Sequence, residues 1–164
     1  MPRISAATNA AQRENTKRAI LESFGKLLYS RGLPGLTMTD VAKNAGIGRT
    51  AVYNYFADMG ELLVAYALDE TERFIKELDE GLEGVDNPID QLAVYIRLQI
   101  EDLARRHLPP GPAMRSMLSP ESYAKLGKHV RELQMVLANI LSAAIAEHYI
   151  PENDIRELAM LIHG

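Results

Sequence analysis

The stretch TMTDVAKNAGIGRTAVYNYF, residues 37–56, decides the fold of this chain. Either of its first two threonines can cap a helix, and Asp40 then lies in the first turn, where the helix dipole favours an anion. Gly46 can adopt the positive φ of a tight turn, after which residues 48–56 form another helix. The stretch therefore predicts two short helices, the first ending near residue 45, joined by a turn of about three residues.

The spacing of small and apolar residues in this stretch is its most selective feature. Ala42 allows two helices to cross closely, Gly46 follows at +4 in the turn, and Val52 follows at +10. This spacing is typical of a DNA-binding helix-turn-helix. Because Val52 and Phe56 turn inward, one turn apart, the other side of that helix must face outward. It carries groups that suit phosphates and base edges in a major groove, namely Arg49, Thr50, Tyr53 and Asn54.

A less specific interpretation of the same helix stays open. Tyr53 could be half-buried in the core, and Arg49 could be an ordinary surface charge. Helical periodicity also runs through the rest of the chain: Ile20, Phe24 and Leu27 form an apolar stripe that ends at SRGLPGL, where glycine and proline stop a helix. No segment alternates as a strand does, so we expect an all-α fold. The expected later helices are 61–80, 88–107 capped by Asn87, 119–147 capped by Ser119, and 154–164, with one helical turn at 113–118.

The composition is that of an ordinary globular protein. The 164 residues are 47% hydrophobic and 24% charged, which suits one or two small domains. The absence of cysteine removes disulfides and thiolate metal sites. The N-terminal segment lacks the apolar core of a signal peptide, and no later stretch reaches the roughly 20 apolar residues of a membrane span. We therefore expect a soluble, cytoplasmic protein without a membrane partner.

The net charge of −4 conceals an asymmetry along the chain. Residues 1–60 carry eight Lys and Arg against four Asp and Glu, whereas the remainder carries ten against eighteen. A basic first part on an acidic body suits a chain whose first part alone meets a polyanion. The alternative is chance clustering of charges on solvated faces, and charge alone does not separate the two.

The run LTMTDVAKNAGIGRTAVYNYFADMGELLVAYA, preceded by a helix ending in LLYSRGLPG, resembles the N-terminal domain of the tetracycline-repressor (TetR) family of bacterial transcription regulators. The resemblance covers residues 13–67, and the rest of the chain is compatible with the family. It implies a three-helix DNA-binding domain over residues 1–60, with a helix-turn-helix, and a helical ligand-binding and dimerisation domain over residues 61–164.

The resemblance also implies which residues meet DNA. Phosphates would be contacted by two residues of the first short helix and by two tyrosines, namely Thr37, Lys43, Tyr53 and Tyr55. Bases or backbone would be contacted by Gly48, Arg49 and Thr50 at the start of the second. Family members often carry a lysine at the position of Met59. In this chain only backbone N–H groups at that helix start could bind the same phosphate.

The body lacks the groupings of residues that catalysis needs. Its histidines have no His or carboxylate partner at metal-site spacing, so none is expected to bind a metal. Ser119 and Ser122 suit the start of a helix, and no glycine-flanked elbow surrounds them. No glycine-rich phosphate loop follows a strand. We therefore expect no enzymatic activity, no metal site and no cofactor.

Soft and aromatic residues in the middle of the chain indicate a pocket for a small, mainly apolar molecule. Methionine fills irregular spaces, and tyrosine places one polar group in an apolar wall. The alternative is that these are ordinary core and interface residues. The candidate ligand-binding residues are Tyr66, Tyr95, Leu98, Gln99, Met114, Met117, Tyr123 and Met135.

The C-terminal segment NDIRELAMLIHG carries an apolar stripe at helical spacing. In the family that this chain resembles, the last two long helices pair with their twins in a dimer. Nothing later in the sequence could cover the stripe, so we expect it to form the dimer face together with part of the long helix over residues 119–147, and a further C-terminal helix to be missing from residues 1–164. The stripe consists of Ile155, Leu158, Ala159 and Ile162.

These observations predict a homodimeric transcriptional regulator. We expect a repressor that binds a palindromic double-stranded operator. A small-molecule inducer would release it by tilting the helix expected over residues 61–80. A regulator that activates, or one that binds no ligand, is a variant of this hypothesis. The alternative from another class is a helical small-ligand carrier or partner-binding protein, which predicts no salt-dependent DNA binding.

Overall fold

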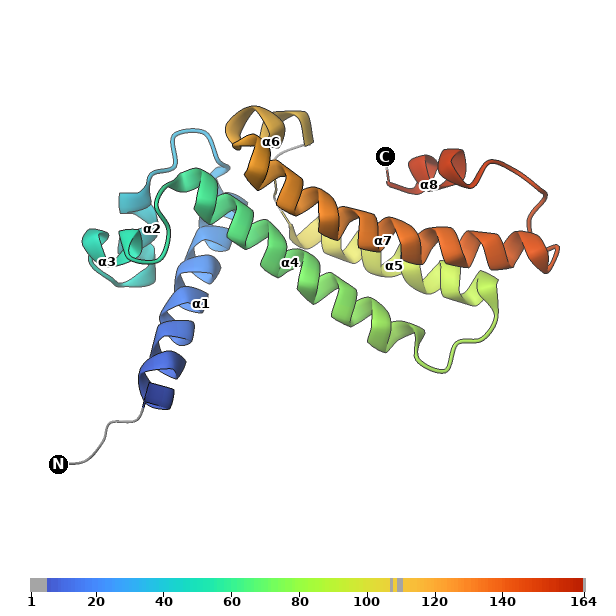
Figure 1. The fold of residues 1–164 in the computed structure, drawn as a ribbon, viewed down its shortest axis with the longest axis horizontal. Coiled ribbons are helices and arrows are strands. Elements are labelled where there is room, and N and C mark those ends of the chain that lie inside the picture. Colours follow the sequence, from blue (N-terminus) through green and yellow to red (C-terminus); the bar gives the residue numbers. More distant parts are fainter. Residues whose placement is uncertain (1–5, 107, 109–110, 164) are drawn as a thin grey trace. The chain divides into compact units, whose positions relative to one another are not determined.

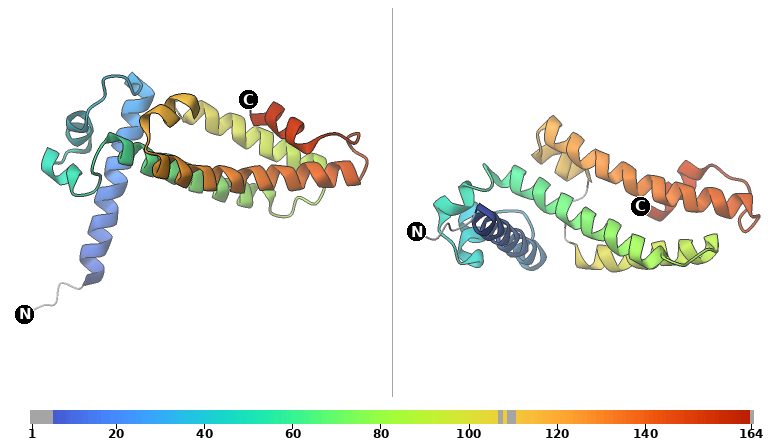
Figure 2. Two further views of the ribbon diagram at one scale, coloured as in Figure 1. Left: turned by 45° about the horizontal axis from the view of Figure 1, so that its top comes forward. Right: turned by 60° about the horizontal axis from the view of Figure 1, so that its bottom comes forward.

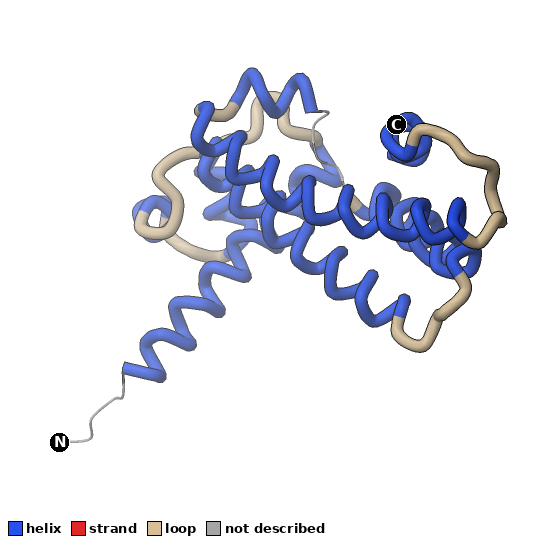
Figure 3. Tube along the Cα trace, turned by 45° about the vertical axis from the view of Figure 1, so that its right-hand side comes forward, coloured by secondary structure: helices blue, strands red, loops and turns tan. Residues whose placement is uncertain are grey.

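All regular structure in the described part of the chain is α-helical (Figure 1, Figure 2). The computed structural model describes residues 6–106, 108 and 111–163, and among these Figure 3 shows helices and loops without a strand. The expected all-α class is confirmed. The helices are α1 (Ala6–Arg31), α2 (Met38–Ala45), α3 (Arg49–Tyr53), α4 (Met59–Leu82), α5 (Pro88–Arg105), α6 (Gly111–Met117), α7 (Pro120–Ala146) and α8 (Ile155–His163).

Thr37, the first of the two candidate threonines, caps α2. Its side-chain oxygen accepts a hydrogen bond from the Asp40 N–H at 3.2 Å, and the Asp40 carboxylate accepts one from the Thr37 N–H at 2.9 Å. This reciprocal pair is a capping box. The hydrogen bonds from Thr37 hold the pKa of Asp40 below its ordinary value. At the other end α2 stops at Gly46, which has a φ of 71°.

α3 is shorter than the helix expected over residues 48–56. It spans Arg49–Tyr53, with Asn54 as its C-cap. The next helix begins soon afterwards, because Asp58 Oδ1 accepts a hydrogen bond from the Glu61 N–H at 2.8 Å in the first turn of α4. The chain must leave helical geometry before that cap, so α3 ends after five residues.

The later helices agree with the expected ones to within a few residues. Asn87 Oδ1 accepts hydrogen bonds from the Ile89 N–H at 2.8 Å and the Asp90 N–H at 3.3 Å, and Pro88 begins α5. Ser119 Oγ likewise accepts from an N–H in the first turn of α7 at 3.1 Å. Two expected helix ends, at residues 107 and 164, lie outside the described residues.

The chain forms two compact units. The first consists of Met1–Ala67 and His107–Tyr123, and the second of Leu68–Arg106 and Ala124–Gly164. This division differs from the expected boundary at residue 60, because the start of α4 is buried in the first unit. The buried α4 residues there are Leu62, Leu63, Val64, Tyr66 and Ala67.

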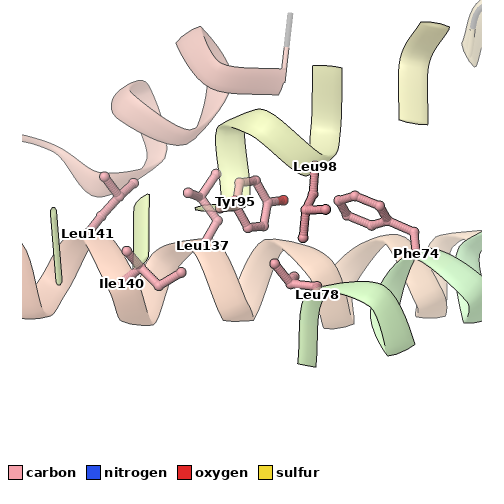
Figure 4. Close-up of a cluster of buried hydrophobic side chains, with 7 residues drawn as sticks. All are labelled: Phe74, Leu78, Tyr95, Leu98, Leu137, Ile140 and Leu141. Carbon is pink, nitrogen blue, oxygen red and sulfur yellow. The ribbon is translucent and has the colours of Figure 1, made fainter. Parts of the chain in front are cut away.

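Seven buried side chains from α4, α5 and α7 form the core of the second unit (Figure 4). The rings of Phe74 and Tyr95 meet edge to face with their centres 6.2 Å apart, a favourable arrangement for aromatic pairs. Full burial of a large apolar side chain stabilises a fold by about 1.5–3 kcal/mol, so these residues hold the three helices together. They are Phe74, Leu78, Tyr95, Leu98, Leu137, Ile140 and Leu141.

The apolar stripe of α8 packs against this same core rather than facing outward. After α7, His148 adopts a positive φ of 61°, and the Tyr149 N–H donates to the Ala144 carbonyl at 2.9 Å, a turn typical of a helix end. The chain then returns so that α8 covers the core. Its four stripe residues Ile155, Leu158, Ala159 and Ile162 are partly buried there. The reason given for a dimer role, a stripe without a partner in its own chain, therefore does not hold.

Gly25→Ala in α1 is expected to lower the free energy of unfolding by about 1–2 kcal/mol. A β-carbon at this position would lie 2.9 Å from Cε2 of Tyr66 and 3.0 Å from its hydroxyl oxygen, closer than van der Waals contact. Overpacking costs about 1–3 kcal/mol, and the better helix propensity of alanine offsets up to about 1 kcal/mol of that. Urea unfolding followed by circular dichroism measures the difference.

Gly127→Ala is the matched control, because it makes the same change in α7 without a clash. A β-carbon there would meet Nη1 of Arg131 at 3.5 Å, an ordinary contact. This variant should therefore gain up to about 1 kcal/mol from helix propensity alone. Equal stability gains in both variants would show that Tyr66 does not pack closely on Gly25.

Candidate DNA-binding surface and ligand cleft

The turn at Gly46 fixes how α2 and α3 meet. Beyond its positive φ of 71°, the Ile47 N–H donates to the Ala42 carbonyl at 3.0 Å, closing the turn. Ala42 and Val52 are 2% and 0% exposed, so each helix turns its small or branched residue inward. The structure thus places the three spacing residues Ala42, Gly46 and Val52 at the junction of the two packed helices.

The other side of α3 faces solvent. Tyr53 is 42% exposed and belongs to the surface, and the Arg49 guanidinium carbon lies 5.7 Å from the centre of its ring. Hydrogen-bonding groups and an aromatic ring thus share one convex face, as a helix in a major groove requires. Of the expected DNA-binding residues, Thr37, Lys43, Gly48, Arg49, Thr50, Tyr53 and Asn54 are exposed, and Tyr55 is half-buried.

Groups at two positions considered for phosphate contacts are engaged within the protein. The hydroxyl oxygen and the N–H of Thr37 both take part in the capping box of α2. At the start of α4, where only N–H groups beside Met59 could bind a phosphate, the Glu61 N–H donates to the Asp58 carboxylate. The carboxylates of Asp58 and Glu61 also repel an anion. The start of α4 is therefore a poor phosphate site.

The sequence motif does not reveal that Arg13 in α1 lies near the candidate recognition surface, which consists of the exposed residues of α2 and α3 and of Tyr55. Its guanidinium carbon lies 5.2 Å from the centre of the Tyr55 ring, within the range of a cation–π contact. Arg13 is exposed, so its charge remains available to a phosphate. Arg13 and Tyr55 lie far apart in the sequence. The excess of basic residues before position 60 was the only available signal, and it does not single out Arg13.

The second unit contains a cleft of about 270 Å³. It is bordered by one side of α5, by the middle of α4 and by part of α7. Its apolar walls come from leucine, valine and aromatic side chains, and its polar groups come mainly from α5. The lining residues are Thr71, Phe74, Tyr95, Gln99, Asp102, Leu103, Arg106, Val130, Leu133 and Gln134.

The cleft includes two of the eight expected ligand-binding residues, Tyr95 and Gln99. Leu98 is part of the buried core beside it. Tyr66 and Met114 are buried in the first unit, where the Tyr66 ring packs edge to face on Phe24 at 5.5 Å. The side chains of Met117, Tyr123 and Met135 are exposed, at 47%, 38% and 64%. The search for tyrosine and methionine therefore did not outline the cleft.

A periodic signal for the cleft was present in the sequence of α5. Four cleft residues of α5 and its C-cap Arg106 recur at i, i+4, i+7, i+8 and i+11, one continuous side of a helix. Asp102 on that side is a charged residue at a position where the pattern calls for burial. The five residues are Tyr95, Gln99, Asp102, Leu103 and Arg106.

The charges in the cleft are paired. Asp102 is 4% exposed and forms an ion pair with Arg106, one turn later. Removal from water nevertheless raises the pKa of Asp102, because burial outweighs the attraction of Arg106. Burial also raises the pKa of Tyr95 to about 12. Nearby, Arg105 donates to both carboxylate oxygens of Glu77, at 3.2 and 2.7 Å.

Among the described residues, no group of three or more His, Asp or Glu side chains could hold a metal ion. None of the described helices combines the length and apolar character that crossing a membrane requires.

Residues 20–66 match the sequence profile of the family described as "Bacterial regulatory proteins, tetR family". Over 74 residues the chain is 34% identical to an uncharacterized HTH-type transcriptional regulator of Haemophilus influenzae, covering 44% of this chain and 36% of that protein. The chain is also 32% identical over 75 residues to the HTH-type transcriptional regulator TtgR of Pseudomonas putida, covering 44% and 36%. It thus spans about a third of the length of these curated relatives.

Solved structures resemble the fold over most of the chain. FadR from Bacillus subtilis in complex with stearoyl-CoA matches with a TM-score of 0.72 and 21% identity, over 88% of this chain and 80% of that one. At such identities the similarity concerns the fold alone. The profile match over residues 20–66 and the helix-turn-helix of the first unit thus show that this part of the chain is similar to the DNA-binding domain of the TetR family of bacterial regulatory proteins, and the rest of the chain shares the all-helical fold of the solved structures.

Proposed function

We propose that this protein is a sequence-specific DNA-binding transcriptional regulator, acting as a repressor that a small, mainly apolar ligand releases from its operator. The observation that carries this proposal is the exposed face of α3, with Arg49, Thr50, Tyr53 and Asn54 turned outward by the burial of Val52. These groups suit both phosphates and base edges. The names of the relatives, which are transcriptional regulators, support the same function.

A single recognition helix of five residues reads too few bases for useful affinity. We therefore propose that two copies bind a palindrome, with recognition helices roughly 34–36 Å apart to enter successive major grooves. The ligand would bind the cleft of the second unit. Because α4 carries both the cleft residues Thr71 and Phe74 and buried residues of the first unit, a shift of α4 would transmit ligand binding to the first unit.

The first test is DNA binding by the purified protein. Selection from random duplexes should yield an imperfect palindrome, and its affinity should fall steeply with salt as Lys and Arg contacts release counterions. A mobility shift assay across a range of salt concentrations measures both. Absence of salt-dependent DNA binding would favour a ligand carrier, and tight binding of one monomer to an isolated half-site would rule out the dimer model.

Substitutions should separate base reading from phosphate anchoring. Thr50→Ala or Asn54→Ala is expected to change which bases are preferred, because these side chains lie on the exposed face of α3. Lys43→Ala should weaken binding to all sequences about equally and reduce the salt slope by about one. Competition assays with a panel of operator variants measure the preferences. A uniform loss in all three variants would mean that α3 does not read the sequence.

Arg13→Ala is expected to behave as a phosphate-contact variant. It removes the exposed cation beside Tyr55, so the salt slope should fall by about one while base preference stays unchanged, and the free energy of unfolding should fall by no more than about 0.5–1 kcal/mol, the value of an exposed cation–π contact. Arg13→Lys should retain most of the slope. Arg18→Ala, a matched loss of an exposed charge on another side of α1, is the control. An equal effect of Arg18→Ala on the salt slope would mean that Arg13 contributes only through the overall positive charge and not through a specific phosphate contact.

A further inference from the structure

Gln99, which lines the cleft, has an unpaired hydrogen-bond acceptor. Its Nε2 donates to the main-chain carbonyl of Ile162 at 3.1 Å, and because a carbonyl can only accept, this contact fixes the orientation of the amide. The other end, Oε1, is then buried without a hydrogen-bond partner among the described residues. A buried acceptor without a donor costs free energy, so a ligand that donates a hydrogen bond there is favoured.

Asp102 lies one turn along the same side of α5. Its carboxylate is paired with Arg106, whose guanidinium carbon lies 5.9 Å from the centre of the Phe74 ring. Arg106 thus occupies a place between a carboxylate and an aromatic ring, which is what an organic cation recognises. The raised pKa of Asp102 means that Arg106 offsets only part of the cost of burial, so another donor beside this carboxylate is stabilising.

The rest of the cleft is apolar and small. Leu103, Val130 and Leu133 complete the wall with Phe74, and the volume is about 270 Å³. That is just below the usual range for ligand pockets, about 300–1,000 Å³, so the body of the ligand must be compact. One aromatic ring with a short chain is of suitable size.

We propose that the cleft binds a protonated primary amine on a compact apolar body. The ammonium group donates to Gln99 Oε1 and to the Asp102 carboxylate, and it displaces Arg106 from Asp102. A carboxylate ligand fits poorly, because it brings further acceptors to Gln99 and a second negative charge to Asp102. A neutral alcohol satisfies Gln99 but leaves the carboxylate without a new cation.

This inference rests on the proposed function and specifies its ligand class. Arg106 also offers a route for the ligand signal, because its N–H donates to the Asp102 carbonyl at 2.8 Å and ends α5. The chain passes from Arg106 directly into the segment His107–Tyr123 of the first unit. Displacement of the Arg106 side chain therefore acts on the residue that links the cleft to that segment.

Isothermal titration calorimetry of the full chain with three probes of one shape tests the ligand class. Phenethylamine, phenethyl alcohol and phenylacetate carry cationic, neutral and anionic groups on the same ring at neutral pH. The amine should bind about tenfold more tightly than the alcohol, the difference expected for a hydrogen bond to a charged group, and phenylacetate should bind most weakly. Equal affinity of amine and alcohol, tighter binding of phenylacetate, or no binding by any probe would overturn the proposal.

Three variants locate the effect. Asp102→Asn keeps the shape of the side chain and should remove the advantage of the amine over the alcohol. Arg106→Leu removes the competing cation and should tighten amine binding, whereas loss of amine affinity in this variant would contradict displacement. Glu101→Gln, an exposed acid of α5 paired with Arg97, is the control for general attraction to an acidic surface and should leave the difference between probes unchanged.

Thermal unfolding of each variant with and without phenethylamine provides a second measurement. Arg106→Leu should be stabilised more by the amine than the unaltered protein is, even if its unfolding temperature is lower. A mobility shift assay without any probe tests the proposed function separately. If the protein binds DNA but prefers phenylacetate, only the proposed ligand class is overturned. If it prefers the amine but does not bind DNA, the proposed function as a regulator is overturned, and an amine-binding protein remains.

Discussion

The left-handed backbone at Gly46 is the constraint on which the recognition surface depends. α3 has only five residues, and a helix this short is not stable alone, because nucleation costs more than its few hydrogen bonds return. Its geometry is imposed from outside by the turn, by the burial of Val52 and by the close approach that Ala42 permits. A β-carbon at Gly46 would meet nothing within 4 Å, so the requirement for glycine there is conformational and not one of space.

The two units differ in how their buried polar groups Ser23 and Asp102 are satisfied. In the first unit the buried hydroxyl of Ser23 lies 2.9 Å from Asn44 Oδ1 and 3.1 Å from the Val41 carbonyl oxygen, so its polar group is satisfied locally. In the second unit Asp102 is buried as one half of an ion pair, which usually adds little stability compared with apolar side chains of the same volume. A costly pair that lines the same cleft as Gln99, whose side-chain oxygen has no partner among the described residues, is better explained by binding than by stability.

Most of the helices were predictable because their ends depend on residues close in the sequence. The features that were not predictable depend on tertiary packing. The caps at Thr37 and Asn87 depend on neighbouring residues, so the sequence indicates them directly. The end of α3 depends on where the following helix starts, and the partner of the α8 stripe depends on the turn at His148, so neither follows from periodicity. Arg13 reaches the recognition surface through contacts distant in sequence. The cleft was missed because residue type was weighed above position on α5.

The free energy needed for regulation sets a condition on the proposed mechanism. Moving an equilibrium from about 1:99 to 99:1 needs about 5.5 kcal/mol of differential ligand affinity between its two states. An amine gains a charged hydrogen bond only in the state in which Arg106 has left Asp102. It therefore favours that state over the other by about 1.5–3 kcal/mol per cleft. One cleft therefore does not complete the switch. Two clefts in the proposed homodimer would supply about 3–6 kcal/mol, so the dimer proposed for DNA affinity would also be what allows a small ligand to release the protein.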